Sequence, residues 1–508
     1  MATAANPPIN DKKEIFSWTM YDWANSAFST TVGTVFLGPY VTGIAGAAAD
    51  ANGFLHLGSL ALRPGSLFAY AVSASVLMQV AFLPVLGALA DYSHIRKKLL
   101  MFFAMLGSLA TMLMFFITDG GHWFAFLLFL IANVSFGASI VFYNAYLPDI
   151  ASEDRRDHVS ASGFAMGYAG GGLLLLLNLV MFMFSDSLGL SGAMVARISL
   201  ASAGVWWLVF AQITFRNLRS RHAVKPIPEG ETYLTIGFSQ LAALLGVSRQ
   251  LVTAMLLLPL LIPILLLFNL PLWAALLPGA GPIGVLIIFI FRKSRTLPEA
   301  MKYLVAYLLY NDGIQTVIAV AAIFASEELN MADTNRILVI LMIQFVAFGG
   351  AYLFSFFAKR MGTKNAILLS LVVWSLAVVF AYFGMRDFSV MEGLGITRAE
   401  LEFWLLGFVV ALILGGSQAL SRSLFSQMIP KEQEAEFFSF YEVSERGTSW
   451  LGTFVFARVN DLTGSLRLGI LSLIFFFFVG LILLPLVKVD KAIEQGKQTG
   501  AIFVGASD

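Results

Sequence analysis

The sequence contains no cysteine, and this absence removes several kinds of site at once. Disulfide frameworks, thiolate metal centres and cysteine nucleophiles are all excluded. Charged residues are also scarce: they form 12% of the 508 residues, where a soluble protein carries about 25%. The five histidines (His56, His94, His122, His158 and His222) are all expected in loops, so we predict no metal site and no cofactor.

Hydrophobic residues make up 58% of the chain and recur in long runs. Runs of about 20 apolar residues predict an all-α polytopic membrane protein. Six spans are expected at about 16–44, 66–90, 99–118, 122–147, 160–184 and 195–215. Six more are expected at about 302–326, 336–358, 364–384, 402–428, 437–457 and 466–487. The polar start, Met1 to Ile15, lacks a signal-peptide core, so the first span is expected to direct insertion.

The spans divide the chain into two helical halves with a linker between them. We predict one six-helix bundle at 1–215, a cytoplasmic linker at 216–301, a second bundle at 302–487 and a poorly ordered polar tail at 488–508. Within the linker, residues 250–291 are apolar but interrupted by prolines such as Pro278 and Pro282. Two crossings at about 250–270 and 272–291 would give about 14 spans. A re-entrant or interfacial hairpin is the alternative.

Basic residues gather in alternate loops, which predicts the orientation of the chain. One side carries Lys12, Lys13, Arg96, Lys97, Lys98, Arg155, Arg156, Arg216, Arg219, Lys359, Arg360 and Lys488. The opposite loops are poor in lysine and arginine. The positive-inside rule therefore places both termini in the cytoplasm, and we expect a bacterial inner-membrane protein.

One predicted span carries a carboxylate, Asp312, flanked by Tyr310 and Asn311 and followed by Gln315. A charge at bilayer depth costs about 3 kcal/mol, so such a group normally faces a water-filled path or a partner. The first span repeats the pattern, because Asp22, Asn25 and Ser26 have the spacing of Asp312, Gln315 and Thr316. Two related spans predict two related halves with a polar site at the midplane between them.

Other polar residues fall inside predicted spans and are further candidates. Tyr143, Asn144, Gln418 and Arg422 are candidates for contact with a substrate or ion, as are Asp22 and Asp312. Glu442, Glu445 and Arg446 are candidates for gating or coupling. Each also has a purely structural interpretation: Asp22 could cap or pair near the interface, and Arg422 could reach the cytoplasm. Glu442 and Arg446 stand four residues apart and could pair with each other.

The loop between the second and third spans carries a recognisable motif. Gly87-Ala-Leu-Ala-Asp91 is followed by the basic cluster Arg96, Lys97 and Lys98. Gly87 permits close helix packing, while Asp91 and Arg96 are gating candidates. The motif resembles the corresponding loop of the major facilitator superfamily, although Tyr92 replaces the usual second basic residue and the later glycine is missing.

More specific blocks lie in both halves. They are Tyr21-Asp-Trp-Ala-Asn-Ser-Ala27, Phe142-Tyr-Asn-Ala-Tyr-Leu-Pro-Asp149, Ser162-Gly-Phe-Ala-Met-Gly-Tyr168, Tyr310-Asn-Asp-Gly313, Gly416-Ser-Gln-Ala-Leu-Ser-Arg-Ser423 and Glu436-Phe-Phe-Ser-Phe-Tyr441. Together they resemble the vacuole effluxer family, a branch of that superfamily typified by a yeast autophagy-related amino-acid exporter. The resemblance runs from about residue 14 to 487, and the apolar hairpin falls outside the family's usual twelve helices.

The resemblance implies a major facilitator-type fold of two six-helix bundles and a secondary transporter that works by alternating access. In that fold helices 1, 4, 7 and 10 line the cavity, and here they carry Asp22, Asn144, Asp312 and Arg422. The implied partners are a small solute such as an amino acid, membrane lipid and a coupling proton. No nucleic-acid partner is expected.

Three alternatives belong to other classes. A nucleotide-driven pump would need a Gly-x-x-x-x-Gly-Lys-Ser/Thr loop, which the sequence does not contain. An intramembrane hydrolase could use Ser139, but the predicted loop positions of the histidines leave it no buried base, so no enzyme is expected. A non-transporting receptor or scaffold would gain nothing from the cost of the buried acids.

Overall fold

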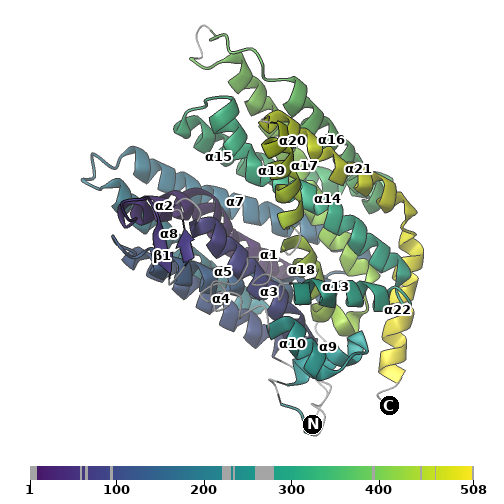
Figure 1. The fold of residues 1–508 in the computed structure, drawn as a ribbon. Coiled ribbons are helices and arrows are strands. Elements are labelled where there is room, and N and C mark those ends of the chain that lie inside the picture. The colour runs from purple at the N-terminus through teal and green to yellow at the C-terminus, as the bar shows by residue number, and fades with distance from the viewer. Residues whose placement is uncertain are drawn as a thin grey trace. The chain divides into compact units, whose positions relative to one another are not determined.

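A computed structural model shows a helical protein (Figure 1). It describes residues 9–57, 60–62, 64, 67–91, 95–219, 230–232, 235–257, 280–391, 395–446, 449–463 and 465–505. Within these residues, ten helices are long and apolar enough to cross a membrane. The count of about fourteen spans stays a prediction, because residues 258–279 of the hairpin lie outside the described part.

Each of the six spans predicted in the first half coincides with helical structure. The elements are α1 (Lys12–Ala27), which continues through the π-helix η1 (Phe28–Phe36) into α2 (Leu37–Ala47), then α3 (Leu67–Asp91), α4 (Arg96–Leu113), η3 (Met114–Phe116), α5 (His122–Asn144), α7 (Arg156–Met183) and α8 (Gly192–Asn217). Shorter elements are the paired strands β1 (Leu55–Leu57) and β2 (Leu60–Leu62), α6 (Leu147–Ile150) and η4 (Glu153–Arg155).

The second half agrees with its predicted spans in the same way. It contains α14 (Pro298–Ile323), η7 (Phe324–Glu328), α15 (Asp333–Met361), α16 (Thr363–Phe383), α17 (Arg398–Met428), η8 (Lys431–Gln433), α18 (Glu434–Arg446), α19 (Ser449–Thr463), α20 (Leu466–Ser472), α21 (Ile474–Leu483) and η9 (Leu484–Leu486). Thr397 and Glu400 start α17 with a reciprocal capping box. The eleventh predicted span is two helices, α18 and α19, on either side of residues 447–448.

Contacts divide the chain into two compact units whose limits differ from the halves of the sequence. Unit 1 comprises Met1–Ala151, Gly170–Arg295 and Lys431–Val443, and unit 2 comprises Ser152–Ala169, Thr296–Pro430 and Ser444–Asp508. The first part of α7 thus packs in unit 2, where the Arg156 guanidinium donates to the Ser426 carbonyl over 2.9 Å. The first part of α18 packs in unit 1, with its Ala435 and Ser439 against Gly87 of α3.

Small residues bring the helices of unit 1 close together. A methyl group added to Gly87 would lie 2.5 Å from the Ala435 carbonyl oxygen, and one added to Gly107 of α4 would lie 2.5 Å from the Trp207 ring. Gly170 of α7 packs in the same way against Trp23 of α1. The predicted close-packing role of Gly87 is therefore confirmed, and Gly170 allows the same close approach of backbones, which needs small side chains.

The linker contributes three short helices to unit 1, beside α3 (Figure 1): α9 (Ile236–Leu245), α10 (Arg249–Leu257) and α13 (Ala280–Lys293). From α13, Phe289 stacks on Phe440 of α18 with 3.6 Å between ring centroids. Lys293 follows on the same helix, with its ammonium 3.8 Å from a Glu436 carboxylate oxygen. The linker therefore packs on α18.

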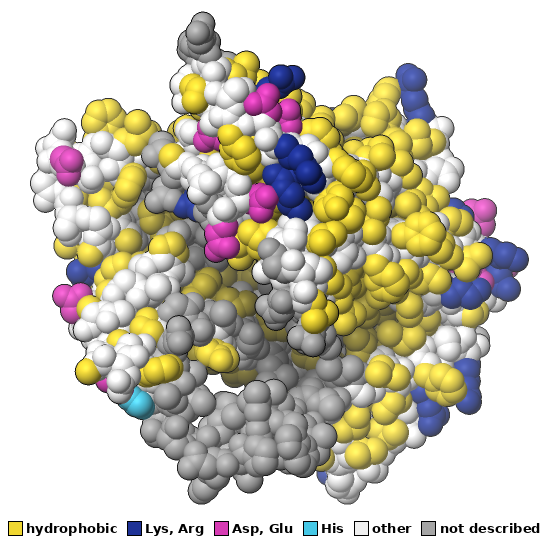
Figure 2. All heavy atoms as spheres, turned by 45° about the horizontal axis from the view of Figure 1, so that its top comes forward, with side chains coloured by type: hydrophobic (Ala, Val, Ile, Leu, Met, Phe, Trp, Pro, Cys, Tyr) yellow, Lys and Arg dark blue, Asp and Glu magenta, His cyan; other side chains and the backbone are white. Residues whose placement is uncertain are grey.

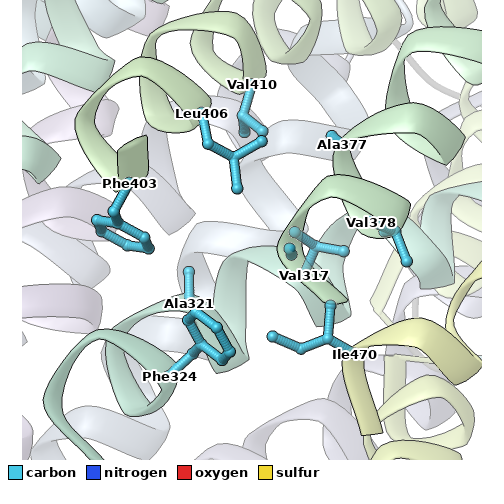
Figure 3. A pocket seen from close by; sticks show the side chains of 10 residues that line it. Val317, Ala321, Phe324, Ala377, Val378, Phe403, Leu406, Val410 and Ile470 are labelled. Carbon is cyan, nitrogen blue, oxygen red and sulfur yellow. The ribbon is translucent and has the colours of Figure 1, made fainter. Parts of the chain in front are cut away.

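Unit 2 is built around α15 and α17, with α16, α14 and α21 beside them. Ala161, Ala165, Ala351 and Ala419 form a small-residue core where the first part of α7 meets these helices. A separate small cavity of about 40 Å³ lies farther along α14 (Figure 3), between residues such as Val317, Phe403 and Ile470. Its lining is apolar, so it has no polar partners with which to hold a water.

The predicted disorder of the tail is wrong for most of its length, because α22 spans Val489–Gly505. Ala492 of this helix is fully buried. Gly496 lies against the backbone of α17, where an added methyl group would be 2.8 Å from the Met428 carbonyl oxygen. The helix is polar in overall composition, but one of its sides is apolar, and that side packs against the rest of unit 2.

Arg467 of α20 joins two segments of unit 2 that follow helices, through an ion pair and two hydrogen bonds. Its guanidinium lies 2.6 Å from a Glu328 carboxylate oxygen and donates to the carbonyls of Gly384 (2.6 Å) and Met385 (2.7 Å). Arg467 is 8% exposed, whereas the Glu328 side chain is 29% exposed and keeps access to water. The main loss on removing the guanidinium is therefore at the Gly384 and Met385 carbonyls, since a buried group left without its hydrogen bond costs about 1–3 kcal/mol.

An Arg467→Gln variant should therefore unfold at a clearly lower temperature than the wild type in mild detergent. Arg386→Gln is the matched control, since Arg386 is exposed just after the end of α16 and, among the described residues, donates to the Tyr382 carbonyl four residues earlier. We expect no measurable change in that control. Equal unfolding temperatures for Arg467→Gln and wild type would contradict the structural role of Arg467.

The molecular surface carries the apolar residues that a membrane protein needs. Figure 2 shows hydrophobic side chains over a broad area of one face, with most charged side chains toward its margins. Large side chains such as Phe116, Leu376 and Phe478 are about 60% exposed. In a soluble protein an apolar patch of this size would be a liability, and here it is the surface that lipid covers.

Candidate functional site

Asp22 lies buried in α1 and is held by an aromatic pair. The Tyr143 hydroxyl of α5 donates to the Asp22 carboxylate over 2.7 Å. Trp18 stacks on the Tyr143 ring with centroids 4.3 Å apart, and its indole N–H donates to the Tyr143 carbonyl. Sequence analysis proposed Asp22 and Tyr143 separately, and the structure brings them together in unit 1.

Asn144 and Glu442 form a second contact in unit 1. The Asn144 amide donates to a Glu442 carboxylate oxygen over 2.8 Å, and both residues are buried. This contact gives Glu442 a partner other than the Arg446 suggested by the spacing. The side chains of Glu445 and Arg446 lie outside the described part of the chain.

Two buried side-chain amides of unit 1 have polar atoms that make no hydrogen bond within the described residues. Among the described residues, the Asn25 amide nitrogen and both polar side-chain atoms of Gln79 have no partner. Gln79, on α3, was missed by the sequence analysis. Gly137 is the residue that could have pointed to Gln79, because a methyl group at position 137 would clash with the Gln79 amide oxygen. Buried polar groups are normally bonded, so these two are candidates for contact with a ligand.

Asp312 lies fourteen residues after the start of α14 and is 1% exposed. One carboxylate oxygen accepts the backbone N–H of Gly452, in α19, over 2.9 Å. Within the described residues, its other oxygen has no partner, and neither do the Asn311 amide or the Thr316 hydroxyl. Gln315, on the same helix, is half-buried. Unit 2 thus holds an acid, an amide and a hydroxyl whose hydrogen-bonding capacity is largely unused.

Tyr310 belongs to a different network on the same helix. Its hydroxyl lies 2.7 Å from the Ser421 hydroxyl and 3.3 Å from the Tyr303 hydroxyl, and Tyr303 donates to the Ser421 carbonyl. All three residues are buried. Neither Tyr303 nor Ser421 was a candidate site residue from the sequence, because their role in joining α14 to α17 depends on the fold.

Arg422 and Gln418 contact the part of α7 that belongs to unit 2. The Arg422 guanidinium donates to the Ser160 hydroxyl (2.9 Å) and carbonyl (2.8 Å) and lies over the Phe164 ring. Gln418 accepts from the Tyr168 hydroxyl over 2.8 Å. Arg422 is 3% exposed, so the expectation that it reaches the cytoplasm is not met. Within the described residues, no ion pair joins Arg422 to Asp312.

Arg96 stands at the centre of a charged cluster in unit 1. Its guanidinium lies 3.2 Å from carboxylate oxygens of both Asp149 and Glu434 and also donates to the Ala145 carbonyl. All three charged side chains are less than a tenth exposed. Neither acid had been proposed for this role, because they lie 53 and 338 residues from Arg96. The side chain of Asp91 is outside the described part.

The sequence spacing matches Asp22 with Asp312, but the packing of the two helices matches a different pair of residues. An added methyl group on Gly171 of α7 would lie 2.8 Å from the Thr30 hydroxyl and 3.1 Å from the Ser26 carbonyl oxygen. One on Gly452 of α19 would meet the Thr316 hydroxyl and lie 3.2 Å from the Asp312 carbonyl oxygen. Packing therefore matches Asp312 with Ser26, so Asp22 sits one turn, about 6 Å, nearer the start of its helix.

Two histidines are not in the loops where they were predicted. His122 begins α5 and His158 lies in α7. Even so, His122 and Ser139 are seventeen residues apart on one helix, about 25 Å, and the Ser139 hydroxyl donates to the Phe136 carbonyl. His122 is therefore not the base that a hydrolase would need at Ser139.

Comparisons with known proteins bear on this arrangement. The family model described as "Vacuole effluxer Atg22 like" matches residues 10–260 and 285–497. "Uncharacterized MFS-type transporter YxiO" of Bacillus subtilis is 27% identical over 96% of this chain and 97% of its own. Autophagy-related protein 22-1 of Penicillium rubens is 28% identical over 87% of this chain and 78% of its own.

Solved structures of major facilitator superfamily (MFS) transporters share the fold. FucP in its outward conformation gives a TM-score of 0.60 at 11% identity, with 94% of this chain and 98% of that one covered. The proton:xylose symporter XylE gives 0.59 at 12% identity, with 93% and 94% covered. At such identities the likeness concerns the fold, which is that of a multi-pass membrane transporter.

Proposed function

We propose that this chain, which belongs to the Atg22-like vacuole effluxer family of MFS-type transporters, moves an amino acid or a similar small solute by alternating access, with protons as the coupling ion. Members of such a family are transporters and not enzymes. We place the protein in a bacterial inner membrane with both termini in the cytoplasm, as the loop charges indicate.

The observation that carries the proposal is the half-satisfied carboxylate of Asp312. A charge inside a span is costly, and one backbone N–H is little compensation for it. Taking up a proton removes the charge, and a bound cationic group would balance it. A residue with these two options can exchange a proton for a solute, which is the elementary step of coupled transport.

The neighbours of Asp312 suit a solute with both charges. Asn311 offers two N–H donors and one acceptor, and Thr316 offers one hydroxyl, while Asp312 can only accept hydrogen bonds when it is ionised and can also donate one when it is protonated. A carboxylate on the solute could take the donors, and an ammonium group could take the free oxygen of Asp312. An amino acid carries both groups. In unit 1, Asn25 and Gln79 are separate candidates for solute contact, because they too have polar atoms without partners among the described residues.

A screen of thermal stability against amino acids, peptides and sugars tests the solute class. A ligand at one hundred times its Kd stabilises the folded protein by about 2.7 kcal/mol. We expect one group of amino acids to raise the unfolding temperature. Stabilisation by sugars alone would contradict the proposed class.

Asn311→Leu should abolish that ligand-induced shift and leave the unliganded protein almost unchanged, because the Asn311 amide makes no hydrogen bond within the described chain. Gln212→Leu, in α8, is the control and should retain the shift. An undiminished shift in Asn311→Leu would remove Asn311 from the proposed contacts.

Orientation can be tested with single reporters, since the chain has no native cysteine. Cysteines at the exposed positions Asn52 and Ser187 should react with an impermeant thiol reagent added outside intact cells, and one at Asp154 should not. The turn at Asn52 should survive the change, because Asp50 accepts its backbone N–H, and a hydrogen bond with His56 keeps the pKa of Asp50 below its usual value. The reverse labelling pattern would invert the topology.

A further inference from the structure

A shallow groove of about 470 Å³ runs along the outside of unit 1, between α7 and α8. Its lining is almost wholly apolar and includes Phe115, Leu174, Leu177, Ile198, Ser202 and Trp206. The groove is open, since Leu177 and the lining residue Val209 are both about half exposed. Its volume lies within the range of about 300–1,000 Å³ that is typical of small-molecule sites.

Arg197 stands at one end of this groove. Its Nε donates to the Phe115 carbonyl over 2.5 Å, and its guanidinium lies 4.9 Å from the centre of the Phe115 ring. Among the described residues no carboxylate forms an ion pair with Arg197. The side chain of the nearby loop residue Asp119 is exposed. Arg197 and Asp119 both interact electrostatically with the side chain of Tyr40. Arg197 is thus a half-buried cation near the start of α8, with donors that are not engaged by a carboxylate of the described residues.

The length of the groove matches one leaflet of a bilayer. Arg197 lies five residues, about 8 Å, after the start of α8 at Gly192. The groove then follows α8 from Ile198 to Phe210, a rise of about 18 Å. Half of a hydrocarbon core is about 15 Å thick. An acyl chain anchored at Arg197 would therefore fill the groove from the interface toward the bilayer centre.

From this match of charge, length and polarity we propose that the groove binds one acyl chain of an anionic phospholipid whose headgroup contacts Arg197. The contact joins a phosphate-bearing headgroup to a guanidinium, the side chain best suited to phosphate. Ser202 lies along the groove and donates to the Asn178 side-chain oxygen, so the one hydroxyl in the lining is internally satisfied. The remaining surface favours hydrocarbon over a polar solute.

A bound chain would act on the helix that carries Asp22. Trp206 lines the groove, and its indole N–H donates to the Trp23 carbonyl of α1 over 3.1 Å. The two indole rings also stack, with centroids 5.6 Å apart. Trp23 adjoins Asp22 in the sequence. Lipid in the groove would therefore press Trp206 against α1 and stabilise the segment that holds this acid, independently of which solute is moved.

Quenching of tryptophan fluorescence by lipids with brominated acyl chains tests the proposal. The full-length protein is reconstituted in phosphatidylcholine, and brominated phosphatidylglycerol or brominated phosphatidylcholine is titrated in. The difference between wild type and Trp206→Phe isolates the signal of Trp206. We expect phosphatidylglycerol to reach half-maximal quenching at about one-fifth of the mole fraction that phosphatidylcholine needs, because one basic residue near the surface favours anionic lipid by about that factor.

Three variants make the test specific. Arg197→Gln should abolish the preference between the two lipids, whereas Arg216→Gln, at the other end of α8, should keep it. Ala201→Phe, which retains Arg197 but fills the groove, should weaken quenching of Trp206 by both lipids, and it decides the matter if Arg197→Gln does not fold. Equal midpoints for both lipids in the wild type, which indicate general lipid contact only, would overturn the proposal. So would a preference that survives Arg197→Gln, or quenching that is unaffected by Ala201→Phe.

Discussion

An Asp312→Asn variant should bind and exchange its solute across a membrane and yet fail to concentrate it. Asparagine keeps the size of the side chain and a carbonyl oxygen that can accept from the solute's ammonium group. Without a negative charge it binds that group more weakly than the ionised acid does, and it has no proton to exchange. One proton moving down 100 mV supplies about 2.3 kcal/mol, which could concentrate a solute about fifty-fold. We expect the wild type to approach such a ratio in proteoliposomes and the variant to stop at equal concentrations on both sides.

Two comparisons sharpen this test. Asp22→Asn should show a weaker defect, because Asp22 already accepts a hydrogen bond from the Tyr143 hydroxyl and lies a turn nearer the start of its helix. Solute exchange between equal internal and external pools should survive in Asp312→Asn, which separates loss of coupling from loss of folding. Accumulation at the wild-type rate in Asp312→Asn would remove Asp312 as the coupling residue and leave Glu442 as the next candidate.

Replacing Arg96 with glutamine should cost about 3–5 kcal/mol of stability and abolish steady transport. The change removes the guanidinium that lies 3.2 Å from both Asp149 and Glu434, and Glu434 is fully buried. Two carboxylates in a site of low dielectric then repel each other without that positive charge. We propose that this cluster, together with the Glu442 contact to Asn144, secures the first part of α18 in unit 1 and releases it during the transport cycle.

The control for this prediction lies two residues away. Lys98 is exposed on the same helix, and Lys98→Gln should change neither stability nor transport. Combining Arg96→Gln with Glu434→Gln should recover part of the lost stability, because one buried charge is then removed along with its partner. An unfolding temperature of Arg96→Gln equal to that of wild type would show that the cluster does not hold α18.

Helix positions could be predicted from the sequence because hydrophobic length is a local property. Each of the twelve core spans falls on a helix, and close packing at Gly87 followed from its small size. The π-helix at Phe28–Phe36 and the helical tail had no such signal, since both depend on tertiary contacts. The family model skips residues 261–284, which agrees with the apolar hairpin being an insertion.

The contacts that the polar residues make could not be predicted from the sequence. Asp22, Asp312, Asn144 and Glu442 could be singled out because a polar group in an apolar span is conspicuous by itself. What each one touches depends on segments that cross between the halves: α18 brings Glu442 to Asn144, and α7 brings Ser160 to Arg422. Gln79 was not predicted as a site residue, because a single glutamine in a long apolar span is also compatible with ordinary helix packing.

We propose that this protein moves amino-acid-like solutes at the expense of a proton gradient. The most direct measurement is uptake of a radiolabelled amino-acid mixture into proteoliposomes of the purified protein, with a proton gradient imposed in either direction. The account predicts accumulation of label for one direction of the gradient, and its collapse when a protonophore is added. Uptake no greater than in protein-free liposomes for either direction, from protein shown to be folded, would contradict the account and favour a receptor or scaffold.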